Sequence, residues 1–304
     1  MKQLFINPES NKLRAGWRIL TFIIIFAIIN LGLTFGVREM LGSLKGGGTL
    51  WFTLLGVSAT IAAYISRKYI DKDTLVSLGL KVDKAAIKDL LYGVFNSALI
   101  MAGIYFTMLF TGLIEFEGMS WWSGNIGSEV HFSMAVLPIV LVVFWKLVIV
   151  AWWEELVFRG IILQNMIKGM GLLWSVVLSC LLFGLVHAGN PDATVLSTIM
   201  IALVTPQLIY AYLKTGQLWL PIGLHLGWNF FQASIFGFAS SGQNSPTLVM
   251  QKAIGPEWLS GGAFGAEGSI LVIPFTIASL YLVHWWVRYS RVPGQKFFGF
   301  LVSE

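Results

Sequence analysis

The stretch AVLPIVLVVFWKLVIVAWWEELVFRGIILQ, residues 135–164, decides the fold class of this chain. Its first part is apolar apart from Lys146, and a run of about 20 such residues can cross the hydrocarbon core of a bilayer as a helix. Glu154, Glu155 and Arg159 then follow within two helical turns. A charge near the bilayer centre costs roughly 2.5 to 3.5 kcal/mol on insertion scales, so these three residues indicate a functional site inside a membrane helix.

Seven further apolar segments flank this one and are also long enough to be helical spans. In chain order, the eight predicted helices cover residues 17–37, 49–65, 90–114, 135–164, 172–188, 193–213, 218–239 and 269–289. The composition agrees, because 56% of the residues are hydrophobic and 12% are charged, whereas soluble domains have about a quarter of their residues charged. We therefore expect an all-α, polytopic membrane protein with about eight transmembrane helices, forming a single domain over residues 1–304.

The basic residues separate the two sides of this predicted bundle. Sixteen Lys and Arg fall on the side that holds both termini, against Arg38, Lys45 and Lys252 on the other. The positive-inside rule then places both termini in the cytoplasm, and we expect the inner (plasma) membrane of a bacterial cell. The net charge of +5 lies in short loops and not on a basic arm, which argues against a nucleic-acid partner. The glycine-rich stretch from Gly255 to Gly268 falls in an outer loop.

Helical spacing brings a small set of polar residues to one layer of the bundle. Glu155 and Arg159 are four residues apart and can form an ion pair, which we interpret as support, while Glu154 is turned about 100° away from Glu155 toward another helix. At 1.5 Å per residue, Glu154 and His187 both lie roughly 21 to 24 Å from the turn near residues 168–171. Counted from Lys214, two further side chains on one helix face, His225 and Asn229, reach a similar depth.

Two chemistries fit this set, and the residues alone do not choose between them. Glu154 and His187 can activate a water molecule as general bases, with His225 and Asn229 as hydrogen-bond donors to an oxyanion. Alternatively, Glu154, His187 and His225 can hold a divalent metal such as zinc with one open coordination position.

The motifs resemble those of a known family. EELVFR, FGLVH and HLGWN fit the EExxxR, FxxxH and HxxxN patterns of the CPBP family (CAAX proteases and bacteriocin-processing enzymes, also called Abi) over roughly residues 137–236. The resemblance implies a CAAX-protease-like helical bundle and an intramembrane peptidase of metallo- or glutamate type. Carried over by motif, Glu154 and His187 activate the water, while His225 and Asn229 form the oxyanion hole.

The expected partners are the lipid bilayer and a hydrophobic or lipid-modified peptide or protein substrate. The rival hypothesis is a non-proteolytic membrane protein, either a transporter or a peptide-toxin immunity factor, that uses the same polar cluster to hold a ligand. Retained biological function in a Glu154→Gln variant would support the rival.

Overall fold

The structure is a computed structural model that describes residues 2–8, 11–42, 48–123, 131–132 and 136–290. Its main helices are α2 (Ala15–Leu41), α3 (Thr49–Ile65), α4 (Lys84–Phe110), α5 (Val136–Glu155), α7 (Leu172–His187), α8 (Val195–Thr215), α9 (Trp219–Phe230) and α11 (Val272–Ser290). Shorter helices are α1 (Lys2–Phe5), α6 (Gln164–Met170) and α10 (Glu257–Ser260). Three π-helical segments are η1 (Ser66–Asp71), η3 (Leu156–Leu163) and η4 (Phe231–Ile235), and three 3₁₀ segments are η2 (Leu75–Leu78), η5 (Gly262–Phe264) and η6 (Ala266–Gly268).

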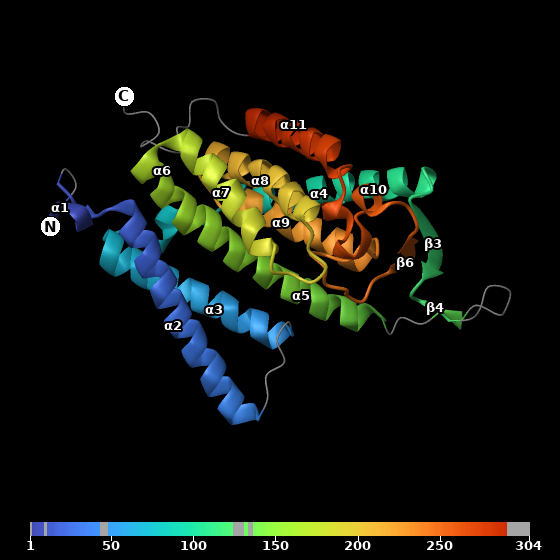
Figure 1. Cartoon of the computed structure of the whole chain (residues 1–304), viewed down its shortest axis with the longest axis horizontal. Helices are drawn as coiled ribbons and strands as arrows, with labels where there is room; N and C mark the ends of the chain where they lie inside the picture. The colour runs from blue at the N-terminus through green and yellow to red at the C-terminus, as the bar shows by residue number, and fades with distance from the viewer. Residues whose placement is uncertain (1, 9–10, 43–47, 124–130, 133–135, 291–304) are drawn as a thin grey trace.

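Each of the eight segments predicted as spans contains a helix, which confirms the all-α membrane fold class. Five helices in the described part of the chain are long and apolar enough to cross a bilayer, and they cover residues 15–41, 49–71, 84–110, 136–170 and 195–215. The other three predicted spans correspond to α7, with 16 residues, to α9 continued by η4, and to α11. In Figure 1 these helices form one elongated bundle from which α2 diverges.

The longest span carries the glutamate pair Glu154 and Glu155. α5, η3 and α6 run without a break over 35 residues, or about 52 Å at the usual rise, which exceeds the roughly 30 Å of hydrocarbon. A π-helical segment begins at Leu156, directly after the glutamate pair. Such wide turns are rare and frequently mark functional sites.

The third predicted span was misplaced by several residues at each end. α4 starts at Lys84, because the side chain of Asp83 accepts a hydrogen bond from the Ala86 backbone N–H at 3.0 Å and caps the helix. It ends at Phe110, and Gly112 then adopts a positive φ of 70°. The apolar residues expected to finish the helix instead begin strand β3 (Ile114–Met119), which pairs antiparallel with β6 (Val249–Ala253).

Short antiparallel ribbons complete the strand content of the described residues. β1 (Ile6–Asn7) pairs with β2 (Lys12–Leu13) near the N-terminus, and β4 (Trp122–Ser123) pairs with β5 (His131–Phe132). Neither ribbon contributes to the site described below.

α9 lies inside the bundle, packed against α4, α5 and α8. Its close approach to α4 depends on glycine, because a Cβ at Gly223 would lie 2.2 Å from the Leu90 carbonyl oxygen. A Cβ at Gly227, one turn further, would lie 2.9 Å from the Val94 backbone. Small residues four apart are the usual means by which membrane helices approach closely. The face of α9 that carries Gly223 and Gly227 packs against α4. Residues such as His225 therefore project from the opposite face of α9.

Basic and acidic side chains form a network at the end of the bundle that holds the N-terminus. The buried Arg67 pairs with Asp71 at 2.8 Å and with Asp73 at 3.0 Å, and the Lys12 ammonium donates to the Asp71 carbonyl. Partial burial would raise the pKa of Asp73, but hydrogen bonding from Thr74 and the charge of Arg67 hold that pKa below its usual value. We call this the basic end.

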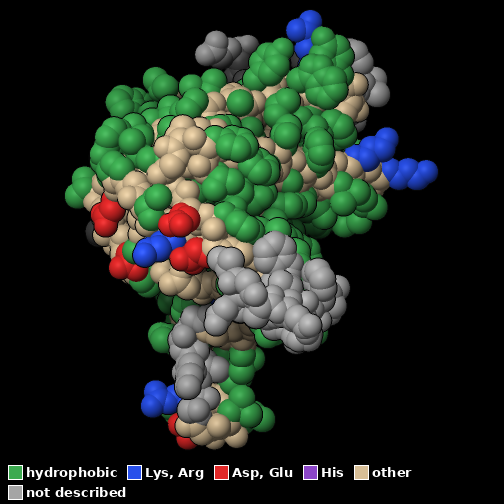
Figure 2. Space-filling view, turned by 90° about the vertical axis from the view of Figure 1, so that its right-hand side faces the viewer, with side chains coloured by type: hydrophobic (Ala, Val, Ile, Leu, Met, Phe, Trp, Pro, Cys, Tyr) green, Lys and Arg blue, Asp and Glu red, His purple; other side chains and the backbone are tan. Residues whose placement is uncertain are grey.

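The opposite end is built from the β3–β6 ribbon, α10, η5 and η6 (Figure 1). Figure 2 views the molecule from this end and shows hydrophobic side chains over most of the face, with a small group of acidic side chains around one basic side chain. The exposed charged residues of this ribbon and of α10 are Glu115, Glu117, Lys252 and Glu257. Three of these four described residues are acidic and one is basic, so the ribbon and α10 show no surplus of basic residues.

Candidate active site

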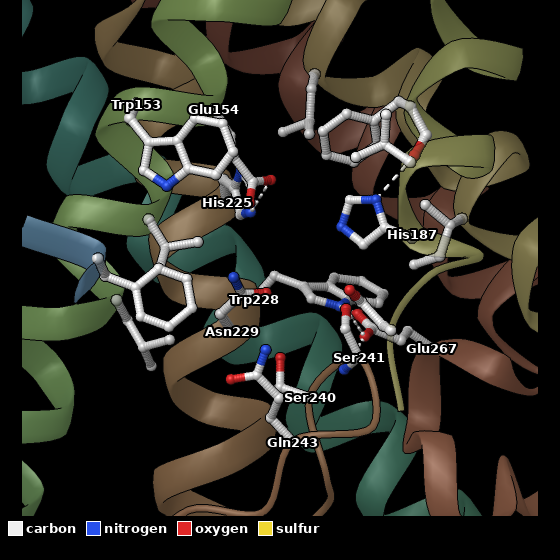
Figure 3. Close-up of a pocket in the computed structure, with 18 of the residues that line it drawn as sticks. Trp153, Glu154, His187, His225, Trp228, Asn229, Ser240, Ser241, Gln243 and Glu267 are labelled. Carbon is white, nitrogen blue, oxygen red and sulfur yellow. Dashed lines mark hydrogen bonds and ion pairs between the residues drawn. The ribbon is translucent and has the colours of Figure 1, made fainter. Parts of the chain in front are cut away.

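A cavity of about 320 Å³ lies among the helices toward the end opposite the basic end. Residues of α3, α5, α7, α8 and α9, a loop that follows η4, and η6 line it. The polar lining residues are Lys146, Glu154, His187, Asn190, Gln207, His225, Asn229, Ser240, Ser241, Gln243, Ser245 and Glu267. The structure thus brings Glu154, His187, His225 and Asn229 to one cavity, as their depths along three separate helices predict (Figure 3).

A chain of four charged or titratable side chains crosses the wall of this cavity. The Glu154 side chain faces the cavity, and its Oε2 lies 3.7 Å from Nε2 of His225. On the other side of the imidazole ring, Nδ1 lies 2.8 Å from Oε1 of Glu155. The same Glu155 oxygen accepts a hydrogen bond from Arg159 Nη1 at 2.9 Å. Glu155 therefore binds one ring nitrogen of His225, and Glu154 lies near the other.

The ion pair expected between Glu155 and Arg159 is present, and both side chains are fully buried. The sequence did not indicate that Glu155 also binds His225 of α9. That contact makes the pair a link between two helices and not a local feature of one. Because a carboxylate only accepts hydrogen bonds, His225 donates from Nδ1 to Glu155.

His187 is positioned by its own helix. Its Nδ1 lies 2.8 Å from the Phe183 carbonyl oxygen one turn earlier, and since a carbonyl oxygen only accepts, Nδ1 carries the proton of that hydrogen bond. In the neutral ring, Nε2 then holds a lone pair. His187 is half-buried and lines the cavity, so this nitrogen is a candidate base.

Phe183 packs against both histidines and against the buried arginine. The guanidinium carbon of Arg159 lies 4.3 Å from the centre of the Phe183 ring, a cation–π distance. The ring centre of Phe183 is 4.6 Å from that of His187 and 6.2 Å from that of His225. Phe183 thus forms an apolar wall beside His187 and also covers the positive charge of Arg159.

Asn229 lies one turn after His225 on α9, is half-buried and lines the cavity. Figure 3 shows it between His225 and Ser240. An amide at this place can donate to an oxygen atom in the cavity from its NH₂ group.

One carboxylate that lines the cavity, Glu267, was not predicted as a site residue from the sequence. Glu267 in η6 is buried and accepts hydrogen bonds from Trp228 Nε1 at 3.2 Å and from Ser241 Oγ at 2.6 Å. The Ser241 backbone N–H donates to it as well. Glu267 belongs to the glycine-rich stretch interpreted as an outer loop, but this segment folds back into the bundle, because Gly265 and Gly268 let it pass close to neighbouring backbone and side chains. The sequence signal available was an acidic residue placed between Ala266 and Gly268 in a glycine-rich segment whose other charged residue is Glu257.

The residues do not fit the zinc set considered from the sequence. Among the described residues, no three His, Cys, Asp or Glu side chains converge as metal ligands. Glu154 Oε2 and His225 Nε2 are 3.7 Å apart, beyond hydrogen-bond distance, and Nδ1 of His225 is already bonded to Glu155. We therefore derive the chemistry from the protein side chains.

The comparisons with known proteins agree with the motif resemblance. Residues 136–231 match the family described as Rce1-like, type II CAAX prenyl endopeptidase. The match covers every helix that carries Glu154, His187, His225 and Asn229. No curated protein matches the chain. The predicted similarity to the CPBP family of intramembrane proteases is confirmed over this region.

Proposed function

We propose that this integral membrane protein, whose residues 136–231 match the Rce1-like CAAX endopeptidases, is an intramembrane endopeptidase that hydrolyses a peptide bond in a hydrophobic or lipid-modified substrate. The observation that carries the proposal is the convergence of a carboxylate, two imidazoles and a carboxamide on one cavity from three helices. The family match supports the reaction class.

In the proposed reaction, a water molecule lies between Glu154 and Nε2 of His187. Proton transfer to one of these bases lets the water oxygen attack the scissile carbonyl carbon, which gives a tetrahedral oxyanion. The proton is then delivered to the leaving amine as the C–N bond breaks. The products are a carboxylic acid and an amine, and the two bases return to their starting states.

Asn229 and His225 are the proposed donors to the oxyanion. Since His225 already donates from Nδ1 to Glu155, donation from Nε2 requires the ring to carry both protons. Such preorganised donors act strongly where water is excluded, and loss of one typically slows a reaction by about 10² to 10³.

We further propose that the protein resides in a bacterial inner membrane with both termini in the cytoplasm. The gathering of Arg67, Lys12 and their neighbours at one end supports this orientation.

Purified protein in proteoliposomes tests the activity, with mass spectrometry of hydrophobic peptide mixtures, farnesylated and unmodified, as the assay. Glu154→Gln and His187→Ala are expected to lower kcat by roughly 10² to 10⁴, and Glu115→Gln, an exposed carboxylate on β3, serves as the matched control. Full activity in the Glu154 and His187 variants would contradict the assignment of these two residues as the water-activating bases.

Two further measurements separate the alternatives. Activity that persists after dialysis against a strong zinc chelator supports the side-chain mechanism, and loss that only zinc restores contradicts it. If Glu154→Gln instead keeps full biological function in cells, a ligand-holding, non-proteolytic role replaces the peptidase.

A further inference from the structure

The lining of the cavity changes character along the bundle. Its inner part, around Glu154 and His225, is formed by buried side chains that are mostly apolar, such as Val150 and Phe183. In the loop that precedes β6, and just after α7, the cavity is lined by polar, uncharged and half-buried residues. We call these residues the mouth, and they are Asn190, Ser240, Ser241, Gln243 and Ser245. The cavity therefore meets the surface of the protein at the mouth.

Loops at the end opposite the basic end build the mouth. α7 runs away from the basic end and ends at His187, so Asn190, three residues later, lies beyond the helix. The other mouth residues belong to the loop between η4 and β6. This loop packs on the segment after α7, since a Cβ at Gly242 would lie 1.8 Å from the Pro191 carbonyl oxygen. Figure 3 shows the labelled residues of the loop on the far side of the cavity from the glutamate side chain.

The basic end of the bundle is closed by η2 and the residues that follow it. Leu78 and Tyr212 are both fully buried, and the Tyr212 hydroxyl donates to the Leu78 carbonyl oxygen at 2.9 Å. The Leu218 backbone N–H donates to the Gly79 carbonyl oxygen at 2.8 Å. Gly79 has a positive φ of 93°, and a Cβ there would lie 2.8 Å from the Gly216 carbonyl oxygen. η2 is thus packed directly onto the turn between α8 and α9.

A layer of packed side chains separates this closure from the glutamate pair. Leu156, Ile161 and Leu163 of η3 are exposed by 1% or less, and they belong to one apolar core with Leu78. Side chains in such a core interdigitate and leave few voids as large as a water molecule. Within the part of the chain that the structure describes, a substrate therefore reaches Glu154 through the mouth and not from the basic end.

The chemistry of a peptide also favours entry from water. An extended peptide segment carries backbone N–H and C=O groups that lack the hydrogen bonds of a helix, and lipid offers no partners for them. The hydroxyl and amide side chains of the mouth can pair with such groups. The segment to be cleaved is therefore expected to arrive from the aqueous side on which the mouth lies.

The distribution of charge assigns that side. The basic end carries Lys12, Arg18 and Arg67, whereas three of the four exposed charged residues of the β3–β6 ribbon and α10 are acidic. In the orientation proposed above, the basic end faces the cytoplasm. The mouth then faces outward.

We propose that the mouth admits substrate from the extracytoplasmic side of the membrane. The enzyme then acts on peptide segments exposed at the outer surface, whether exported peptides or outward-facing parts of membrane proteins. A lipid-modified protein anchored on the cytoplasmic face cannot present its chain to the mouth. This inference rests on the proposed peptidase function, and it makes location across the membrane the first determinant of which peptides are cleaved.

The test compares right-side-out and inverted membrane vesicles from bacteria that express the full-length protein. The substrate is a hydrophobic peptide that the purified wild-type protein cleaves, coupled through a flexible linker to dextran, which cannot cross the membrane. Intact right-side-out vesicles are expected to cleave it, whereas inverted vesicles show a loss of cleavage until detergent opens them. Vesicles that carry the Glu154→Gln variant measure cleavage by host proteases.

Chemical blocking of the mouth provides a second measurement. In a Cys180→Ala background, Ser245→Cys places a thiol at the mouth and Lys88→Cys places one near the basic end. A bulky, membrane-impermeant maleimide added to right-side-out vesicles is expected to abolish cleavage by the Ser245→Cys variant, relative to its rate before treatment. The Lys88→Cys variant is expected to keep its rate. Mass spectrometry verifies modification of residue 245, and Ser240→Cys replaces Ser245→Cys if the latter does not fold.

Three results would overturn the inference while leaving the peptidase intact. They are cleavage confined to inverted vesicles, equal cleavage by intact vesicles of both kinds, and full activity of the Ser245→Cys variant after its thiol is modified. Absence of cleavage both by purified wild-type protein and by detergent-opened vesicles would instead remove the proposed function, and this inference with it.

Discussion

His225 of α9 and Glu155 of α5 are joined by a hydrogen bond of 2.8 Å between Nδ1 and Oε1. Because the same oxygen binds Arg159 at 2.9 Å, the orientation of the imidazole depends on a buried ion pair. Removing one member of such a pair usually leaves an uncompensated charge and destabilises a protein by about 3–5 kcal/mol. Glu155 is thus a positioning residue for His225.

Substitutions at Glu155 and Arg159 are expected to distinguish the contribution of this ion pair to stability from its role in positioning His225. Glu155→Gln and Arg159→Met should each lower the free energy of unfolding by about 3–5 kcal/mol, and the double variant should lose less than the sum because no unpaired charge remains. Thermal unfolding in detergent measures this. The double variant should still show a depressed kcat with little change in KM, since a neutral amide replaces the carboxylate that accepts from His225. Additive losses of stability would contradict the coupling.

Glu267 offers a second prediction, because it holds the loop at Ser241 and the indole of Trp228 together. Glu267→Gln replaces an acceptor with an NH₂ group facing donors, and we expect a loss of about 1–3 kcal/mol in unfolding free energy together with a lower kcat. Glu257→Gln, an exposed residue nearby, is the control. If both variants behave like the wild type in unfolding and turnover, Glu267 does not support the cavity.

The close packing of α9 on α4 predicts a strong effect from a single methyl group. Gly223→Ala would place a Cβ 2.2 Å from the Leu90 carbonyl oxygen, and the forced shift is expected to cost about 1–3 kcal/mol and to displace His225. Gly36→Ala in α2 meets no atom within 4 Å and is the matched control. Differential scanning fluorimetry of the two variants, beside their turnover rates, checks the contrast.

The two ends of the bundle should lie on opposite sides of the membrane. In a Cys180→Ala background, Lys252→Cys on β6 and Lys88→Cys near the basic end place single thiols at exposed positions. A membrane-impermeant maleimide added to intact cells is expected to label residue 252 and not residue 88 until the cells are lysed. Labelling of residue 88 but not of residue 252 in intact cells would contradict a cytoplasmic basic end and indicate the opposite orientation.

Much of this architecture was predictable from apolar run length. The span at 49–65 coincides with α3, and the polar and charged residues beyond it continue the helix as the π-helical η1. The shared depth of Glu154 and His187 followed from the rise of a helix and the position of one turn, and that of His225 from its distance to Lys214. That turn lies at Gly171, between α6 and α7.

Contacts that depend on how the helices are rotated and packed against one another could not be predicted from the sequence. The bond from Glu155 to His225 requires the rotation of α9, which is set by glycine contacts with α4. Glu267 escaped prediction because a glycine-rich segment has no periodicity that would indicate burial. The shifted ends of α4 followed from the cap at Asp83 and from the pairing of β3 with β6, neither of which hydropathy records.

Because α9 lies inside the bundle, it does not have to match the thickness of the bilayer. The helix is 12 residues long, roughly 18 Å, and packs against α4, α5 and α8. A helix shielded in this way has no hydrophobic length to match to the bilayer. Changes in lipid thickness tilt or strain the outer helices first, so the geometry around His225 and Asn229 is insulated from the acyl-chain composition of the surrounding lipids.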